Sequence, residues 1–183
     1  FLYPGCGYGG SCFPKDVKAL AHTAREHGYT MQVIEAVERV NEQQKGIVFE
    51  KLQTALGDLR GKVVAIWGLA FKPETDDMRE APATVVIGRL LDAGAEVRAY
   101  DPVAIPEAQR RMKDKPIRYV RTMYEAAEGA DAVALMTEWK ELRMPDWSQL
   151  NATMRGEVIV DGRNIFDKAE VEAAGFRYFG IGK

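Results

Sequence analysis

A short segment near the beginning of the chain combines a cysteine, a lysine and an aspartate at a spacing that suits covalent catalysis. Pro14 suits the first position of a helix, which places Cys12 beside the helix N-terminus. A helix N-terminus stabilises a thiolate, and the ammonium group of Lys15 adds positive charge nearby. Asp16, expected in the first turn of this helix, can orient a water molecule or a substrate hydroxyl. These residue types indicate a cysteine nucleophile assisted by a carboxylate.

The glycine-rich run before Cys12 contains the letters of a dinucleotide-binding fingerprint without its structural context. Gly5, Gly7 and Gly10 satisfy G-x-G-x-x-G, but that fingerprint must follow a strand. Only four residues precede Gly5, so we interpret the run as a loop whose backbone approaches a ligand. Residue types alone support two interpretations of Cys12 equally, a nucleophile and a cysteine packed beneath this loop.

Two helical patterns follow the loop. The first runs from Pro14 to Gly28, and the second from Met31 to Leu56. The second predicts one helix on the order of 40 Å long, because mostly apolar residues recur along one of its faces. These residues are Val33, Val37, Val40, Gln44, Val48 and Leu52. Helices of this length often join domains or form dimer contacts, so we expect a homodimer through this region.

From residue 59 onward, predicted strands alternate with predicted helices. Strands are expected at 62–67, 96–100, 117–120, 132–136, 158–160 and 178–181, and helices at 81–93, 106–113, 123–128, 147–154 and 168–174. Continuous apolar strands such as VVAIW and AVALM favour a parallel sheet that is covered on both faces. The sequence therefore predicts an α/β chain in two parts, a loop and helical region over 1–58 and a Rossmann-like domain over 59–183.

Two longer motifs give this pattern a family resemblance. The run from Pro4 to Asp16 resembles the active-site motif of the UDP-glucose/GDP-mannose dehydrogenase family, and the run from Gly68 to Glu80 resembles the family's second motif. Shorter matches follow in order at Tyr100-Asp101-Pro102, Thr137-Glu138-Trp139 and Asp161-Gly162-Arg163-Asn164. The resemblance covers the whole chain. Cys6 stands where the family often has proline or a small apolar residue, and we hypothesise that this second thiol makes the enzyme sensitive to oxidation.

The resemblance implies an NAD-dependent four-electron oxidation of UDP-glucose to UDP-glucuronate, a precursor for polysaccharide synthesis. Cys12 would form a thiohemiacetal and then a thioester with the sugar, and Asp16 would assist the hydrolytic water. The nucleotide sugar is expected to contact Tyr3, Pro4, Gly5, Cys6, Gly7, Tyr8, Gly9, Phe71, Lys72 and Arg163. NAD is expected to approach Cys12, Phe13, Pro14, Lys15 and Arg79. Lys72 and Arg163 can complement the charge of a pyrophosphate.

One acidic residue and one missing region qualify this expectation. Asp101 follows a predicted strand, as does the acidic residue that binds an NAD ribose in dinucleotide folds, but we interpret Asp101 as structural. The family's NAD-binding domain lies upstream of the first motif and is absent from this chain. We therefore expect the chain to be the C-terminal part of a longer enzyme and to be inactive alone.

Bulk properties exclude several classes of protein. The net charge of −2 and the lack of a basic stripe argue against nucleic-acid binding. No apolar stretch reaches the roughly 20 residues that span a bilayer, and no cluster of residues has metal-ligand spacing. Two cysteines in one loop are too few for a disulfide framework, so a reducing compartment, the cytoplasm, is expected.

Three alternatives remain open. The substrate could be GDP-mannose or UDP-N-acetylmannosamine in place of UDP-glucose. The chain could be a nucleotide-sugar-binding module without catalysis. An unrelated Rossmann-like interaction domain would leave the cluster from Cys12 to Asp16 unexplained.

Overall fold

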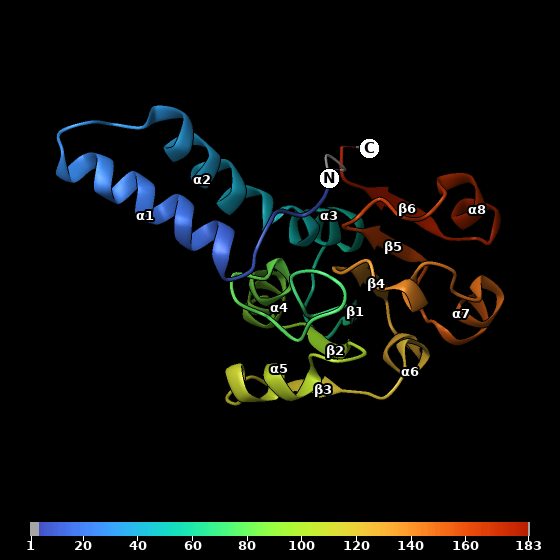
Figure 1. The fold of residues 1–183 in the computed structure, drawn as a ribbon. Coiled ribbons are helices and arrows are strands. Elements are labelled where there is room, and N and C mark those ends of the chain that lie inside the picture. Colours follow the sequence, from blue (N-terminus) through green and yellow to red (C-terminus); the bar gives the residue numbers. More distant parts are fainter. Residues whose placement is uncertain (1–3, 183) are drawn as a thin grey trace.

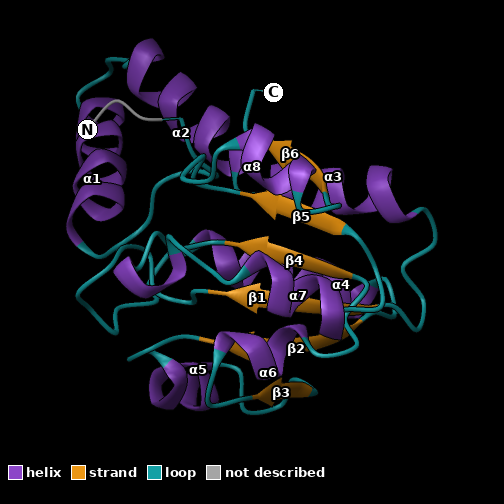
Figure 2. Cartoon of the chain, turned by 90° about the vertical axis from the view of Figure 1, so that its right-hand side faces the viewer, coloured by secondary structure: helices purple, strands orange, loops and turns teal. Residues whose placement is uncertain are grey.

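The computed structural model describes residues 4–182, whose centre is a six-stranded parallel sheet with the strand order β3-β2-β1-β4-β5-β6 (Figure 2). The strands are β1 (Val63–Trp67), β2 (Glu96–Tyr100), β3 (Ile117–Tyr119), β4 (Ala132–Leu135), β5 (Val158–Asp161) and β6 (Arg177–Gly180). This order is that of a doubly wound nucleotide-binding sheet. The predicted Rossmann-like α/β fold is confirmed.

Helices cover both faces of the sheet, and this explains why its central strands are apolar throughout. Every residue of β1 and of β4 is buried. The covering helices are α3 (Ile47–Leu56), α4 (Pro82–Asp92), α5 (Ile105–Arg111), α6 (Met123–Ala127), α7 (Trp147–Thr153) and α8 (Lys168–Ala173), with a 3₁₀ turn at Lys140–Leu142. In Figure 1, α3, α4 and α5 lie to the left of the strands, and α6, α7 and α8 lie to the right.

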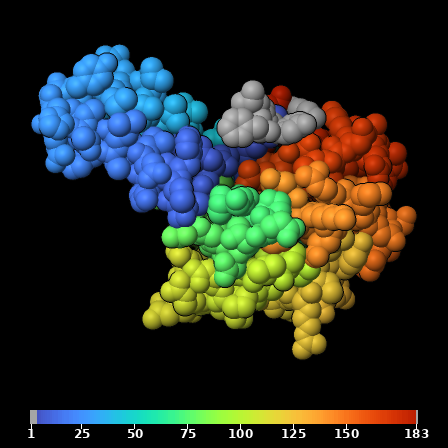
Figure 3. All heavy atoms as spheres, viewed as in Figure 1, coloured from blue at the N-terminus to red at the C-terminus, as the bar shows by residue number. Residues whose placement is uncertain are grey.

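Two antiparallel helices, α1 (Cys12–Glu26) and α2 (Gln32–Gln44), form a hairpin that projects away from the sheet (Figure 1). The space-filling view shows the hairpin as a blue arm beside the α/β body (Figure 3). None of the helices within the described residues is long and apolar enough to cross a membrane.

The predicted single helix over 31–56 is wrong, because the chain breaks it at Lys45 and Gly46 into α2 and α3. A Cβ at position 46 would lie 2.1 Å from Nη1 of Arg89 on α4, which is the end of a flexible side chain and can move aside. After this break, Val48 and Leu52 of α3 are fully buried in the core. The apolar stripe is therefore continuous in sequence but divided between two helices that have different surroundings.

Helix α1 also begins earlier than predicted. Cys12 is its first residue and Ser11 its N-cap, so Pro14 is the third helical residue and not the first. The ring remains compatible with this position, because the first four N–H groups of a helix have no helical partner. Asp16 lies one turn after Cys12, and the first turn of α1 contains no acidic residue. The expectation that Asp16 lies in that turn is corrected accordingly.

Asp101, at the carboxyl end of β2, holds the connections around the sheet edge together. Its carboxylate is 2% exposed and accepts hydrogen bonds from the backbone of Leu69 and Ala70 at 2.7 and 3.2 Å. It also accepts from the backbone of Val103 and Ala104, at 2.9 and 2.7 Å, and from the indole of Trp139 at 3.1 Å. The structural interpretation of Asp101 is confirmed.

We predict that Asp101→Asn lowers the free energy of unfolding by about 2–3 kcal/mol, because an amide nitrogen replaces one oxygen that buried donors require. Urea unfolding followed by circular dichroism measures this change. The exposed Asp92→Asn is the matched control and should shift the free energy by less than about 0.5 kcal/mol. Equal midpoints for the two variants would contradict the role given to Asp101.

Candidate active site

A cavity of about 780 Å³ lies between the glycine-rich loop, α2 and the carboxyl ends of three strands. The loop and the start of α1 contribute Gly5, Gly7, Tyr8, Gly9 and Phe13, and α2 contributes Val33, Ala36, Val37, Val40, Asn41 and Gln44. Phe71 and Lys72 follow β1, Glu138 follows β4, and Arg163 follows β5. Ligands of open α/β sheets bind at this edge, where the strand order reverses between β1 and β4.

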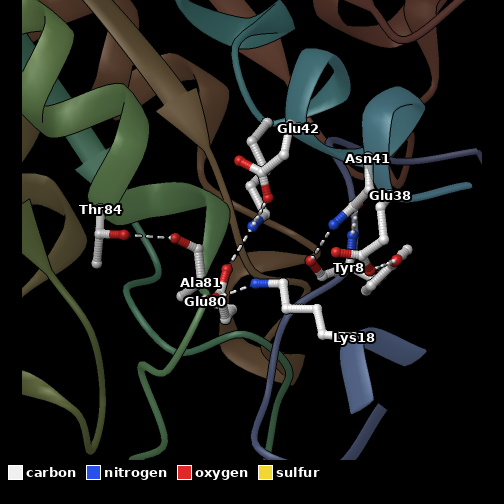
Figure 4. A network of polar contacts seen from close by, with 9 residues as sticks. Tyr8, Lys18, Glu38, Asn41, Glu42, Glu80, Ala81 and Thr84 are labelled. Atoms are coloured by element: carbon white, nitrogen blue, oxygen red, sulfur yellow. Dashed lines mark hydrogen bonds and ion pairs between the residues drawn. The ribbon is translucent and has the colours of Figure 1, made fainter. Parts of the chain in front are cut away.

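Helix α2 holds the glycine-rich loop by hydrogen bonds to its backbone. Asn41 accepts from the N–H of Tyr8 at 2.8 Å and donates to its carbonyl at 3.1 Å. Gln44 donates to the carbonyl of Gly5 at 2.7 Å. The hydroxyl of Tyr8 donates to Glu38 at 2.9 Å, and burial together with this carboxylate raises the pKa of Tyr8 to about 12 (Figure 4). The loop therefore has a defined shape along the cavity wall.

Glycines allow the same loop to lie directly on the segment that follows β1. A Cβ at Gly9 would be 2.5 Å from the carbonyl oxygen of Glu80. Gly10 has φ +93°, and a Cβ there would be 2.8 Å from the ring of Phe71. The N–H of Gly10 donates to the carbonyl of Arg79 at 2.7 Å. The two motifs predicted from the sequence are therefore in direct contact.

Arg163 joins three segments that meet at the cavity. Its side chain is 14% exposed, and its guanidinium group donates to the carbonyls of Met136 at 2.7 Å, Phe71 at 3.2 Å and Gly7 at 3.4 Å. Oε2 of Glu138 lies 3.2 Å from Nε of Arg163 as an ion pair, although this buried oxygen receives no well-directed hydrogen bond. Arg163 thus connects three segments of the cavity wall and also gives the cavity a positive charge.

The side chain of Cys6 packs into the core and does not line the cavity, contrary to the expected ligand contact. It is 0% exposed, and its N–H donates to the carbonyl of Gly162 at 2.9 Å. Burial raises the pKa of its thiol, which disfavours the reactive thiolate. The hypothesis that Cys6 makes the enzyme sensitive to oxidation therefore loses its basis. Cys6 and Cys12 are both free cysteines.

Cys12 is exposed at the first residue of α1, beside the loop that forms one wall of the cavity. Its Sγ lies 3.6 Å from the hydroxyl of Ser11. Phe13 follows it and meets the ring of Tyr8 edge-on, with ring centres 4.8 Å apart. The ammonium of Lys15 pairs with the exposed carboxylate of Asp16 at 3.3 Å. The expected nucleophile and its carboxylate are thus accessible from solvent.

The remaining predicted site residues lie around this cavity rather than in it. Pro14 is a buried residue of α1, and Pro4 lines a neighbouring cavity of about 570 Å³. Arg79 is exposed and pairs with Asp77 at 2.9 Å, and the hydrogen bond to this carboxylate raises the pKa of Arg79. Tyr3 lies outside the described residues.

Two features that a dinucleotide fold would offer to NAD, an acidic residue after β2 and a glycine after β1, are used by the protein itself. The carboxylate of Asp101, which a dinucleotide fold would offer to a ribose, is consumed by the protein's own donors. Gly68, directly after β1, packs against Thr137 and not toward an open phosphate site. Within residues 4–182, no group of histidines, cysteines or carboxylates is arranged to hold a metal ion.

Sequence reasoning missed the contribution of α2 to the cavity. Asn41 and Gln44 hold the loop, and Val33, Val37 and Val40 line the cavity while 75%, 38% and 61% exposed. The signal was available in part, because Gln44 is a polar residue within the mostly apolar stripe and Asn41 is a polar residue beside it. Which partner their amides bind depends on the tertiary fold.

Comparison with known proteins agrees with this geometry. The UDP binding domain of the UDP-glucose/GDP-mannose dehydrogenase family matches residues 65–168, and the central domain of the same family matches residues 1–43. Because the first match covers more than half of the chain, the chain belongs to the UDP-glucose/GDP-mannose dehydrogenase family.

Individual relatives resemble the chain along its whole length. It is 48% identical to the UDP-glucose 6-dehydrogenase of Pseudomonas aeruginosa, covering 100% of this chain and 42% of that protein. It is 43% identical to the UDP-glucose 6-dehydrogenase TuaD of Bacillus subtilis, covering 100% and 40%. A UDP-glucose dehydrogenase structure from Pyrobaculum islandicum superposes with a TM-score of 0.84 at 36% identity, covering 97% and 38%. The chain therefore spans about two fifths of the length of these relatives.

The carboxylate of Glu80 makes the site's stability depend on pH. Lys45 and Lys18 lower its pKa from 4.5 to about 2. A carboxylate whose pKa is lower in the folded state adds stability that is complete above its unfolded pKa and is lost as the pH falls. We predict that Glu80→Gln lowers the free energy of unfolding at pH 7 by about 1 kcal/mol, after allowance for solvent screening.

This difference between parent and variant should shrink below pH 4.5 and vanish near pH 2. Urea unfolding at a series of pH values measures it. A difference that stays constant between pH 7 and pH 2.5 would show that the charge of Glu80 contributes no stability.

Proposed function

We propose that this chain binds a nucleotide sugar in the 780 Å³ cavity and supplies the cysteine nucleophile of an NAD-dependent UDP-glucose 6-dehydrogenase. One observation carries the proposal. The glycine-rich loop, Phe71, Lys72 and Arg163 come from distant parts of the sequence, and they line one cavity beside the helix that begins with Cys12. The close similarity to UDP-glucose 6-dehydrogenases supports the choice of substrate.

The walls of the cavity suit a sugar nucleotide. The ammonium of Lys72 lies 5.4 Å from the centre of the Phe71 ring, so a cation and an aromatic surface stand together. With Arg163 it gives the cavity two positive groups for a diphosphate. A volume of this size suits a ligand as large as a sugar nucleotide.

Cys12 would carry the sugar through the second half of the oxidation. The first oxidation turns the C6 alcohol into an aldehyde, and the thiolate adds to it so that a carbon–sulfur bond forms. Loss of a hydride from this thiohemiacetal leaves a thioester. Water then adds, the carbon–sulfur bond breaks, and the carboxylate and the thiol are released. Asp16, one turn after Cys12, would orient that water.

NAD⁺ supplies the hydride acceptor in this proposal, and its binding domain belongs to a longer polypeptide. UDP-glucose, two NAD⁺ and one water give UDP-glucuronate, two NADH and three protons. The relatives are more than twice as long as this chain, which supports an additional domain. Cys12, Phe13, Pro14, Lys15 and Arg79 would form the edge that faces the cofactor.

We further propose a division into residues 1–58, which carry the active-site loop and dimer contacts, and residues 59–183, which bind UDP. Val33, Val37 and Val40 on α2 are exposed apolar side chains that a second copy could cover. Free cysteines agree with a location in the cytoplasm. Supply of UDP-glucuronate to polysaccharide synthesis follows from the proposed product.

The second candidate substrate is UDP-N-acetylmannosamine. A UDP-D-ManNAc dehydrogenase structure from Pyrococcus horikoshii superposes with a TM-score of 0.79 at 32% identity, covering 98% of this chain and 40% of that chain. GDP-mannose is a third. Rates of NADH formation by the full-length enzyme with the three sugars decide among them.

In the full-length enzyme, we predict that Cys12→Ser lowers kcat for UDP-glucose oxidation by at least about 1000-fold, because the nucleophile is lost. NADH absorbance measures the rate. Cys6→Ala removes the buried thiol and serves as the matched control, with a rate within about fivefold of the parent. The 183-residue chain alone should form no NADH. Turnover of UDP-glucose by Cys12→Ser at the parent rate would refute the assignment.

A further inference from the structure

We propose that Glu80 is a positioning residue for the nucleophile, an inference that rests on the proposed function. Its carboxylate connects Lys18 on α1 with Lys45 at the end of α2, while its backbone lies against the glycine-rich loop just before Cys12 (Figure 4). Glu80 and its neighbour Arg79 thereby contact the chain on both sides of Cys12. They meet the glycine-rich loop before it and Lys18 after it.

The first of these contacts is made by the backbone of Arg79 and Glu80. Glu80 has φ +55°, a left-handed conformation that non-glycine residues rarely adopt. In this conformation its carbonyl faces Gly9, where a Cβ would be only 2.5 Å away. The carbonyl of the preceding Arg79 accepts the N–H of Gly10 at 2.7 Å. Gly9 and Gly10, the two residues just before Ser11 and Cys12, therefore pack against the turn formed by Arg79 and Glu80.

The second of these contacts is made by the side chain of Glu80. Oε1 of Glu80 accepts from Nζ of Lys18 at 2.9 Å, and Oε2 accepts from Nζ of Lys45 at 2.7 Å. Lys18 lies six residues after Cys12, about 9 Å along the helix. Within the described residues, this ion pair is the one hydrogen-bonded side-chain link between α1 and the α/β body.

Lys45 ties this arrangement to the break between α2 and α3. Its side chain is 3% exposed, and it also donates to Glu42 at 2.8 Å. A buried ammonium needs nearby carboxylates, so loss of one of them disturbs the other contacts. Glu80 therefore couples α1, the end of α2 and the turn before α4.

Position matters here because Cys12 must attack one carbon of a bound sugar. A displacement of about 1 Å from a productive geometry can lower a rate by on the order of 100-fold. The outer face of α1 is exposed, and Leu20 on it is 51% exposed. The contacts made by Arg79 and Glu80 thus have a direct effect on where the thiol stands.

The test compares Glu80→Gln with Glu107→Gln. Glu107 is a suitable control because it also pairs with two basic side chains, Arg110 and Arg111, which lower its pKa to about 2, but both of these ion pairs stay within α5. In the 183-residue chain, hydrogen exchange should become roughly tenfold faster at the amide of Gly10 in Glu80→Gln. Exchange there should be unchanged in Glu107→Gln.

In the full-length enzyme, Glu80→Gln should lower kcat for UDP-glucose by roughly ten- to 100-fold while KM stays within about threefold. Glu80→Asp, which keeps the charge, should recover part of the lost rate. Lys18→Met removes only the ion pair between α1 and Glu80 and leaves the Glu80–Lys45 pair intact. It therefore tests the same effect if Glu80→Gln folds poorly. It should lower kcat in the same direction by a smaller factor.

Unchanged kcat in Glu80→Gln, or in Lys18→Met where the first variant does not fold, would overturn the positioning role. A fall in kcat without faster exchange at Gly10 would also overturn it. If the parent enzyme forms no NADH from UDP-glucose, the proposed function fails, and the hydrogen-exchange comparison still decides whether Glu80 holds the loop.

Discussion

The close contact between two backbone segments, Gly9–Gly10 and Arg79–Glu80, is the constraint on which the rest of the site depends. Side chains at Gly9 or Gly10 would collide with the carbonyl of Glu80 or the ring of Phe71. Because the two segments touch, the loop that precedes α1 packs beside the edge of the parallel sheet. The cavity exists because α2 and the strand ends then face each other across that loop.

Buried and half-buried charges hold this arrangement through hydrogen bonds to the backbone and to one another. Arg163 binds carbonyls from three segments, and Asp101 binds N–H groups from two connections at the same edge of the sheet. Asp161, the last residue of β5, acts similarly by accepting from the backbone of Arg163 and Phe166. Such groups are costly to bury without partners, so each one restricts the connections to a single arrangement.

The sequence predicted the α/β region well, because runs such as VVAIW and AVALM belong to strands buried on both faces. It failed where tertiary contacts decide. Periodicity did not reveal the break at Lys45 and Gly46, nor that Cys6 would be buried beside Gly162. The family motifs identified Phe71, Lys72 and Arg163, which line the cavity. The bonds from Asn41 and Glu80 join residues more than 30 positions apart, and no local pattern shows them.

The central claim is that the cavity between the glycine-rich loop and the carboxyl ends of β1, β4 and β5 holds the nucleotide sugar with its C6 carbon near Cys12. A crystal structure of the full-length Cys12→Ser enzyme soaked with UDP-glucose tests this most directly. The structure presented here predicts the diphosphate near Lys72 and Arg163 and C6 within about 4 Å of the serine hydroxyl, a separation close to that of reacting atoms. Electron density for the sugar nucleotide elsewhere on the protein, or C6 pointing away from position 12, would contradict it.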